Sequence, residues 1–174
     1  MADVWRRALM ERHPQLFAPT GYPTVGDGWR DLLDRALARI AAAVAREPAD
    51  SEIRIVQIKE KLGALRLYFN SRKLSAKALA KVREAIDLAE ARSACTCEEC
   101  GAQGRLYDRG GWLLTRCADH ATGEPVPIPP GCENVHVKQT FENGKLRVVS
   151  CRRYDRERDI LVEAPLPPDF YEES

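Results

Sequence analysis

The sequence lacks the long apolar segments of secreted and membrane proteins. Its first seventeen residues contain no apolar run of the roughly 7–15 residues that a secretory signal needs. The longest strongly apolar stretch, residues 40–45, is far shorter than the roughly 20 residues that cross a bilayer as a helix. We therefore expect a cytoplasmic protein with no membrane partner. In that compartment clustered cysteines bind metal more often than they form disulfides.

An excess of charge of either sign is also missing. The chain has 27 basic and 26 acidic side chains, with a net charge of +1. This balance excludes a nucleic-acid coat protein that is basic throughout and a protein with a strongly acidic tail. Hydrophobic residues at 44% and charged residues at 30% indicate a globular chain.

Patterns typical of catalysis are absent as well. Apart from His120, the only histidines are His13 and His136, and neither adjoins a serine, cysteine or acidic partner in a known motif. The sequence has no glycine-rich phosphate-binding loop. We therefore predict no catalytic residues and a protein that is not an enzyme.

Hydrophobic periodicity predicts the secondary structure of the first half of the chain. Apolar residues recur every three or four positions in three segments, which predicts helices over residues 3–12, 28–46 and 75–92. Residues 53–58 and 64–69 are rich in β-formers and predict a hairpin, with the polar residues 59–61 and Gly63 between its strands.

The helix over residues 28–46 has local signals of its own. Asp27 is a candidate N-cap, and Asp31 and Arg35 form a favourable i,i+4 pair. The segment before it, residues 18–28, contains two prolines and three glycines and predicts a loop.

The last third of the chain predicts β-structure. A proline-rich connector covers residues 124–132, and Asn143-Gly144 is the strongest short signal for a hairpin turn. We expect a β-meander here, followed by a loose acidic tail over residues 164–174. The predicted fold class is α+β: two helices packed on a small antiparallel sheet, a treble-clef-like zinc finger and a C-terminal β-meander. The corresponding parts of the chain are residues 1–94, 95–123 and 124–174.

The motif with the clearest chemistry is Cys-x2-Cys followed, after sixteen residues, by Cys-x2-His. Its members are Cys97, Cys100, Cys117 and His120. Thiolate and imidazole are the natural ligands of tetrahedral Zn²⁺, and x2 spacing lets one tight turn direct two thiolates at one ion. Two short β-runs fill the gap. With four protein ligands the ion has no open position, so we predict a structural Zn²⁺ rather than a catalytic one.

The other three cysteines are less informative. Cys95, two residues before the motif, is a candidate alternative ligand or redox-active thiol, although a cysteine without a role is the simpler interpretation. Cys132 and Cys151 are isolated and indicate small buried apolar residues.

Residues 51–94 hold ten basic side chains against five acidic ones. This local excess is compatible with contacts to a nucleic-acid backbone, although an ordinary solvated helix face is the favoured interpretation. The candidate nucleic-acid-binding residues are Lys59, Lys61, Arg66, Arg72, Lys73, Lys77 and Lys81.

Four aromatic residues are candidate stacking platforms for single-stranded nucleic acid: Trp29, Tyr68, Tyr107 and Trp112. Trp29 and Trp112 lie on apolar faces of their predicted elements, so for these two we favour packing in the core.

The ordered combination of several stretches resembles a family of small proteins from bacteria and their phages. The stretches are residues 27–33, residues 56–68, residues 89–93 and the cysteine motif with Trp112, so that the resemblance covers about residues 27–120. The family often has an aromatic residue where this chain has Leu62 and Leu67, and its fourth metal ligand varies. The resemblance implies a compact α+β body with a zinc finger in a phage or mobile-element context, and it implies no activity.

Three functions are compatible with these features. The first is a non-enzymatic regulator or inhibitor that recognises another protein. The second is a nucleic-acid-binding protein that uses residues 51–94. The third is a redox-responsive zinc switch that uses Cys95.

Overall fold

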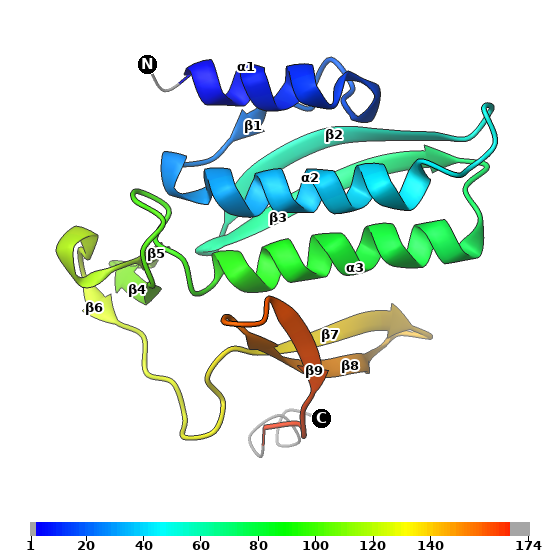
Figure 1. Cartoon of the computed structure of the whole chain (residues 1–174). Helices are drawn as coiled ribbons and strands as arrows, with labels where there is room; N and C mark the ends of the chain where they lie inside the picture. The colour runs from blue at the N-terminus through cyan, green and yellow to red at the C-terminus, as the bar shows by residue number, and fades with distance from the viewer. Residues whose placement is uncertain (1–2, 168–174) are drawn as a thin grey trace. The chain divides into compact units, whose positions relative to one another are not determined.

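The computed structural model describes residues 3–167, which form an α+β protein with three α-helices and three small sheets (Figure 1). The chain divides into two compact units, Met1–Val126 and Pro127–Ser174. Residues 168–174 of the predicted loose tail lie outside the described residues. Within the described part of the chain, no helix combines the length and the apolar character needed to cross a membrane.

The first sheet is built on the predicted hairpin. Strands β2 (Glu52–Lys61) and β3 (Ala64–Arg72) are antiparallel and joined by the two residues Leu62 and Gly63. Both turn residues have positive φ, 55° and 78°, as a type I′ turn requires. The strands therefore continue through residues 59–61, which the sequence analysis placed in the turn, because two residues suffice to reverse the chain.

A third strand of this sheet was not predicted. Strand β1 (Pro23–Thr24) pairs with β2 in parallel, with Pro23 opposite Ile58, so the order is β1-β2-β3. It lies in the segment predicted as a loop. A strand of two residues with a proline has no hydrophobic alternation that a sequence could reveal.

Helices α2 (Arg30–Val44) and α3 (Ala76–Ser93) lie side by side along the hairpin (Figure 1). Helix α1 (Asp3–Arg12) adds Trp5 and Leu9 to the same core. Alternate residues of the strands are buried with the apolar faces of the helices, which explains the two periodicities of the sequence. The fully or almost fully buried strand residues are Ile53, Ile55, Ile58, Leu65 and Leu67.

The predicted role of Asp27 is wrong. Residues Asp27–Trp29 form a 3₁₀ turn (η2), and α2 begins at Arg30 without a side-chain cap. The Asp27 carboxylate instead accepts a hydrogen bond from Trp5 Nε1 at 2.8 Å and pairs with Arg6 at 3.0 Å. The bond from Trp5, helped by Arg6, lowers the pKa of Asp27. Asp27 therefore ties α1 to the start of α2. The predicted Asp31–Arg35 pair is confirmed, at 2.9 Å.

The unit Pro127–Ser174 contains the third sheet. Strands β7 (Val135–Glu142), β8 (Lys145–Asp155) and β9 (Ile160–Glu163) are antiparallel and adjacent in sequence order, as predicted for a β-meander. Asn143 and Gly144 make the predicted turn, with φ of 51° and 77°.

Candidate metal centre

The first two candidate ligands lie in a tight turn directly after α3. Cys97 N donates to Ala102 O and Gly101 N donates to Cys97 O, both at 2.8 Å. Gly101 has a φ of +80°, which a residue with a side chain rarely adopts. This turn, which we call the knuckle (residues 97–101), brings the Cys97 and Cys100 thiols together.

In the next segment, the two predicted β-runs pair as a hairpin. Strands β4 (Arg105–Arg109) and β5 (Trp112–Arg116) are joined by Gly110 and Gly111, which both have positive φ. Asp108 fixes the turn by accepting a hydrogen bond from Gly111 N at 2.6 Å. A short strand, β6 (Glu124–Pro125), pairs with β4 and was not predicted.

The hairpin returns the chain to the knuckle and delivers the other two ligands. Cys117 follows β5, and His120 ends the short 3₁₀ turn η3 (Ala118–His120). The ligand atoms of Cys97, Cys100, Cys117 and His120 all lie within 4.8 Å of one another, an arrangement that could hold a metal ion. The structure therefore brings together all four residues of the predicted motif.

Three separations between ligand atoms of this group are short: one joins two sulfurs, and two join a sulfur to the histidine nitrogen. Cys100 Sγ lies 3.7 Å from Cys117 Sγ, and His120 Nδ1 lies 3.3 Å from Cys117 Sγ and 3.7 Å from Cys97 Sγ. These are van der Waals or hydrogen-bond distances, and no two of the thiols form a disulfide. The donor set is three sulfurs and one nitrogen.

The backbone around the knuckle favours ionised Cys97. Burial of this thiol opposes ionisation, but hydrogen bonds from the backbone of Cys117, Cys100 and Glu99 outweigh it and lower its pKa to about 7. The pKa of Cys100 is raised: although the backbone of Ala102 lowers it, partial desolvation and the neighbouring thiols have the larger combined effect. One thiol of the group is thus prepared to bind a cation near neutral pH.

The knuckle is held to the hairpin by an arginine that the sequence analysis missed. Arg116 pairs with Glu98 at 3.1 Å and with Glu99 at 3.0 Å, and its side chain is almost fully buried. Glu98 also accepts a hydrogen bond from Gly26 N at 2.9 Å. Only the position of Arg116, directly before a ligand, could have suggested this role.

The knuckle also contacts the start of α2. Gly28 N donates to Glu98 O at 2.8 Å, and the buried Trp29 donates through Nε1 to Thr96 O at 2.9 Å. A Cβ atom on Gly28 would lie 2.3 Å from Cys97 O and 2.4 Å from Gly101 N, so only glycine permits this approach. Core packing of Trp29, as predicted, is confirmed.

The hairpin is anchored to the first sheet. Thr115, 1% exposed, donates its hydroxyl to Gly63 O at 2.6 Å, in the turn between β2 and β3. Next to this turn, Leu65 N donates to Ser93 Oγ at 2.8 Å, a bond between β3 and α3 within the α/β body. The β4–β5 hairpin therefore contacts the body at Gly63, in addition to the contacts of the knuckle with the start of α2.

Cys95 lies outside the group of four. Its side chain is buried, and Sγ donates to Arg92 O, 3.4 Å away, at the C-terminal end of α3. Cys151 is buried as predicted; its Sγ donates to Pro165 O at 3.3 Å, and burial raises its pKa. Cys132 is only half-buried.

The seven basic residues proposed to bind nucleic acid do not form one surface. Lys59, Lys61 and Arg66 alternate with buried strand residues, whereas Lys77 and Lys81 are exposed on α3. Three of the seven take part in ion pairs, which reduce the charge they present: Arg66 with Glu90 at 4.0 Å, Arg72 with Glu52 at 3.7 Å and Lys73 with Asp50 at 2.5 Å.

The prediction that Trp112 packs in the core is wrong. Its side chain is 62% exposed: Trp112 begins β5 beside the turn at the end of the hairpin, whereas Leu114, two residues further and on the same face, is buried. Tyr68, on β3, is also exposed.

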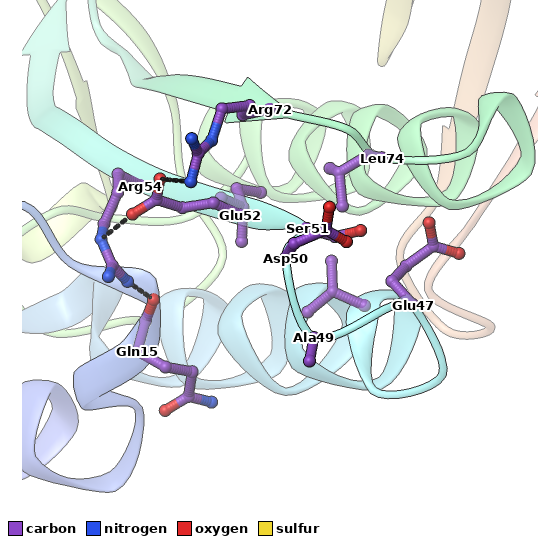
Figure 2. Close-up of a pocket in the computed structure, with 11 residues that line it drawn as sticks. Gln15, Glu47, Ala49, Asp50, Ser51, Glu52, Arg54, Arg72 and Leu74 are labelled. Carbon is purple, nitrogen blue, oxygen red and sulfur yellow. Dashed lines mark hydrogen bonds and ion pairs between the residues drawn. The ribbon is translucent and has the colours of Figure 1, made fainter.

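A hollow of about 300 Å³ lies between the end of α2 and the start of β2 (Figure 2). Its lining carries charges of both signs, and these pair with one another. Glu52 forms ion pairs with Arg54, 3.1 Å away, and with Arg72. Arg54 also donates to the backbone carbonyl of Gln15. The carboxylate is thus neutralised within the protein.

Comparison of the chain with protein-family models, curated proteins and solved structures finds no match. The resemblance to a bacterial and phage family is therefore not confirmed, and the cysteine–histidine group is the part of it that the structure contains.

Proposed function

We propose that this protein binds one structural Zn²⁺ through Cys97, Cys100, Cys117 and His120. The observation that carries the proposal is the convergence of these four ligand atoms. Zn–S and Zn–N bonds of about 2.3 and 2.0–2.1 Å in a tetrahedron place ligand atoms about 3.8 Å apart for two sulfurs and about 3.6 Å for sulfur and nitrogen. The separations of 3.7, 3.7 and 3.3 Å agree with this geometry.

The order of elements around the ion supports the finer assignment to a treble-clef-like finger. A knuckle supplies Cys97 and Cys100, a hairpin follows, and the turn after it supplies Cys117 and His120. Four protein ligands leave no position for a water molecule, so the proposed ion stabilises the module and does not act in catalysis. This supports the assignment of the chain as a non-enzymatic protein.

We assign the protein a role in recognising another protein. The support is an exposed apolar region on the β7–β8 hairpin, where Phe141 and Leu146 lie directly opposite each other and are 70% and 64% exposed. Val148, on the same face, is also exposed. Contiguous apolar surface of this kind is typical of protein interfaces. A regulatory role in a phage or mobile-element context is the part of this proposal that rests on the resemblance.

Metal analysis tests the first proposal. Freshly purified protein should contain about one equivalent of zinc, and Cys117→Ser should lose most of it. Cys132→Ser is the matched control, because Cys132 lies outside the group, and should keep its zinc. Replacement by Co²⁺ should give the thiolate charge-transfer bands of a tetrahedral site. Less than about half an equivalent in the unmodified protein, or equal zinc in both variants, would contradict the proposal.

Comparative crosslinking tests the second proposal. A Phe141→Ser, Leu146→Ser double variant should lose any partner that both the unmodified protein and an exposed-charge control, Lys145→Gln, retain. If the double variant still crosslinks to the same partners, the surface around Phe141 and Leu146 is not the interface.

A further inference from the structure

The β4–β5 hairpin separates its aromatic and basic side chains from its acidic ones. In the antiparallel register, Arg109 lies opposite Trp112 and Tyr107 opposite Leu114. Residues opposite each other share a face, and neighbours along a strand alternate between faces. One face therefore carries Arg105, Tyr107, Arg109, Trp112, Leu114 and Arg116.

The acidic residues belong to the other face. Asp108 lies opposite Leu113, and its neighbour on β6 is Glu124. Thr115, on the same face as Asp108, is bonded to Gly63, so this face is the one anchored to the first sheet. No acidic residue of β4, β5 or β6 occupies the opposite face.

Four residues of this face reach solvent wholly or in part, and we call them the hairpin face: Arg105, Arg109 and Trp112 are exposed, and Tyr107 is half-buried opposite the buried Leu114. Trp112 is 62% exposed and Arg109 is exposed. Arg105 is exposed and donates one hydrogen bond, from Nη2 to Val126 O at 3.0 Å, which leaves its other N–H groups free. Arg116 is excluded from this set because Glu98 and Glu99 neutralise it.

The hairpin face is held in place by the rest of the module. Asp108 fixes the turn at one end, and Thr115 anchors β5 in the first sheet. The metal ligand Cys117 directly follows β5. A ligand therefore meets a surface that is ordered beforehand, which lowers the entropic cost of binding.

We propose that the hairpin face binds single-stranded nucleic acid. Exposed aromatic rings on a sheet beside unpaired cations stack unpaired bases while the cations contact phosphates. In this arrangement a base stacks on Trp112, Tyr107 offers a second ring, and Arg105 and Arg109 bind the backbone. A duplex keeps its bases stacked internally and offers Trp112 no free ring. An acidic peptide would satisfy the arginines but not the indole.

The test uses the full, zinc-loaded chain and fluorescence anisotropy. A fluorescein-labelled oligothymidylate of about 15 nucleotides should bind at about 50 mM salt and dissociate as salt rises. Trp112→Ala should weaken binding about tenfold, whereas Trp112→Phe keeps a ring and should retain most of the affinity. Arg109→Gln should weaken binding and reduce the slope of log affinity against log salt by about 0.7.

Matched controls separate this surface from others. A Lys77→Gln, Lys81→Gln double variant removes two exposed cations of α3, and Phe141→Ala removes an exposed ring of the other unit. Both should bind the oligonucleotide normally. Zinc content measured on each variant shows whether the module is intact, so failure of nucleic-acid binding in a zinc-loaded protein is distinct from failure of the metal site.

Several outcomes would overturn the proposal. They are the absence of binding at low salt, equal binding by Trp112→Ala, tighter binding of a duplex of the same length, and loss of binding in the α3 double variant alone. Preferential binding of a polyglutamate peptide would instead identify the hairpin face as a site for acidic proteins.

Discussion

At the scale of single residues, hydrogen bonds and an ion pair that involve buried side chains join segments that are far apart in the sequence. Asp27 holds α1 through Trp5 and Arg6, Trp29 reaches Thr96, and Thr115 reaches Gly63. Each of these bonds satisfies a polar group that would be costly to bury alone. None has a signature in the sequence, since each depends on a partner at least 19 positions away.

Thr115→Val tests the shortest of these contacts. Valine has nearly the same shape, but it leaves the Gly63 carbonyl without its partner in a buried site. We expect a loss of about 1–3 kcal/mol in the free energy of unfolding, measured with urea on the zinc-loaded protein. Thr20→Val, at an exposed turn, is the control and should change stability little. Equal stability of both variants would mean that the bond contributes nothing net.

At the scale of elements, the sequence predicted the segments that have a regular hydrophobic period or characteristic turn residues. It missed the segments that have neither. The helices and the two long hairpins follow from hydrophobic periods and from turn residues such as Asn143-Gly144. The metal ligands follow from their spacing. Strand β1, the start of α2 and the exposure of Trp112 could not be predicted, because they depend on which face of an element meets a distant one. Trp112 looked like a core residue only while its strand was considered without its partner.

The turn between β2 and β3 contains a residue ill suited to its conformation. Leu62 has a φ of 55° and is 60% exposed, so it bears left-handed strain and leaves an apolar side chain in water. Leu62→Asn should stabilise the protein by about 0.5–1 kcal/mol, because asparagine adopts this conformation readily. Thermal unfolding of the zinc-loaded protein measures the effect. A lower melting temperature would show that Leu62 makes a contact that outweighs its strain.

The contact between the knuckle and α2 depends on the absence of a side chain at residue 28. Gly28→Ala would place a methyl group against three backbone atoms of the knuckle, which cannot move aside as a side chain can. We expect a lower affinity for zinc, by tenfold or more, in competition with a chromophoric chelator. Gly110→Asn is the control, since nothing lies within 4 Å of that position and asparagine tolerates its positive φ. Unchanged affinity in Gly28→Ala would show that the knuckle forms independently of α2.

At the scale of the whole molecule, the proposed metal binding would be coupled to folding through Cys97. In the metal-free protein the pKa of this thiol is lowered from 9.0 to about 7, so between these values the unfolded chain binds more protons than the folded one. Stability of the metal-free protein should therefore rise from pH 7 to pH 9 and fall as the pH drops through 7. Cys100, whose pKa is raised, titrates above this interval.

Urea unfolding of chelator-treated, reduced protein at several pH values measures this dependence. Cys97→Ser should show a flatter profile over the same interval, and the zinc-loaded protein should be more stable than either at every pH above 7. A profile that falls between pH 7 and pH 9 would have the wrong sign and would contradict the lowered pKa.

The hydrogen bonds of residues 96 and 98 with Gly28 and Trp29 have a consequence for the order in which the parts of the protein fold during synthesis. Gly28 and Trp29 are synthesised about seventy positions before their partners, Glu98 and Thr96, and the residues of α1 to α3 are all synthesised before the first candidate ligand, Cys97. Domains generally fold as they leave the ribosome, N-terminal parts first. The growing chain can thus assemble its helices and first sheet without metal. In the proposed function, binding of Zn²⁺ is then the last step in the folding of this unit, and a shortage of zinc during translation would leave the α/β body folded without an ordered knuckle.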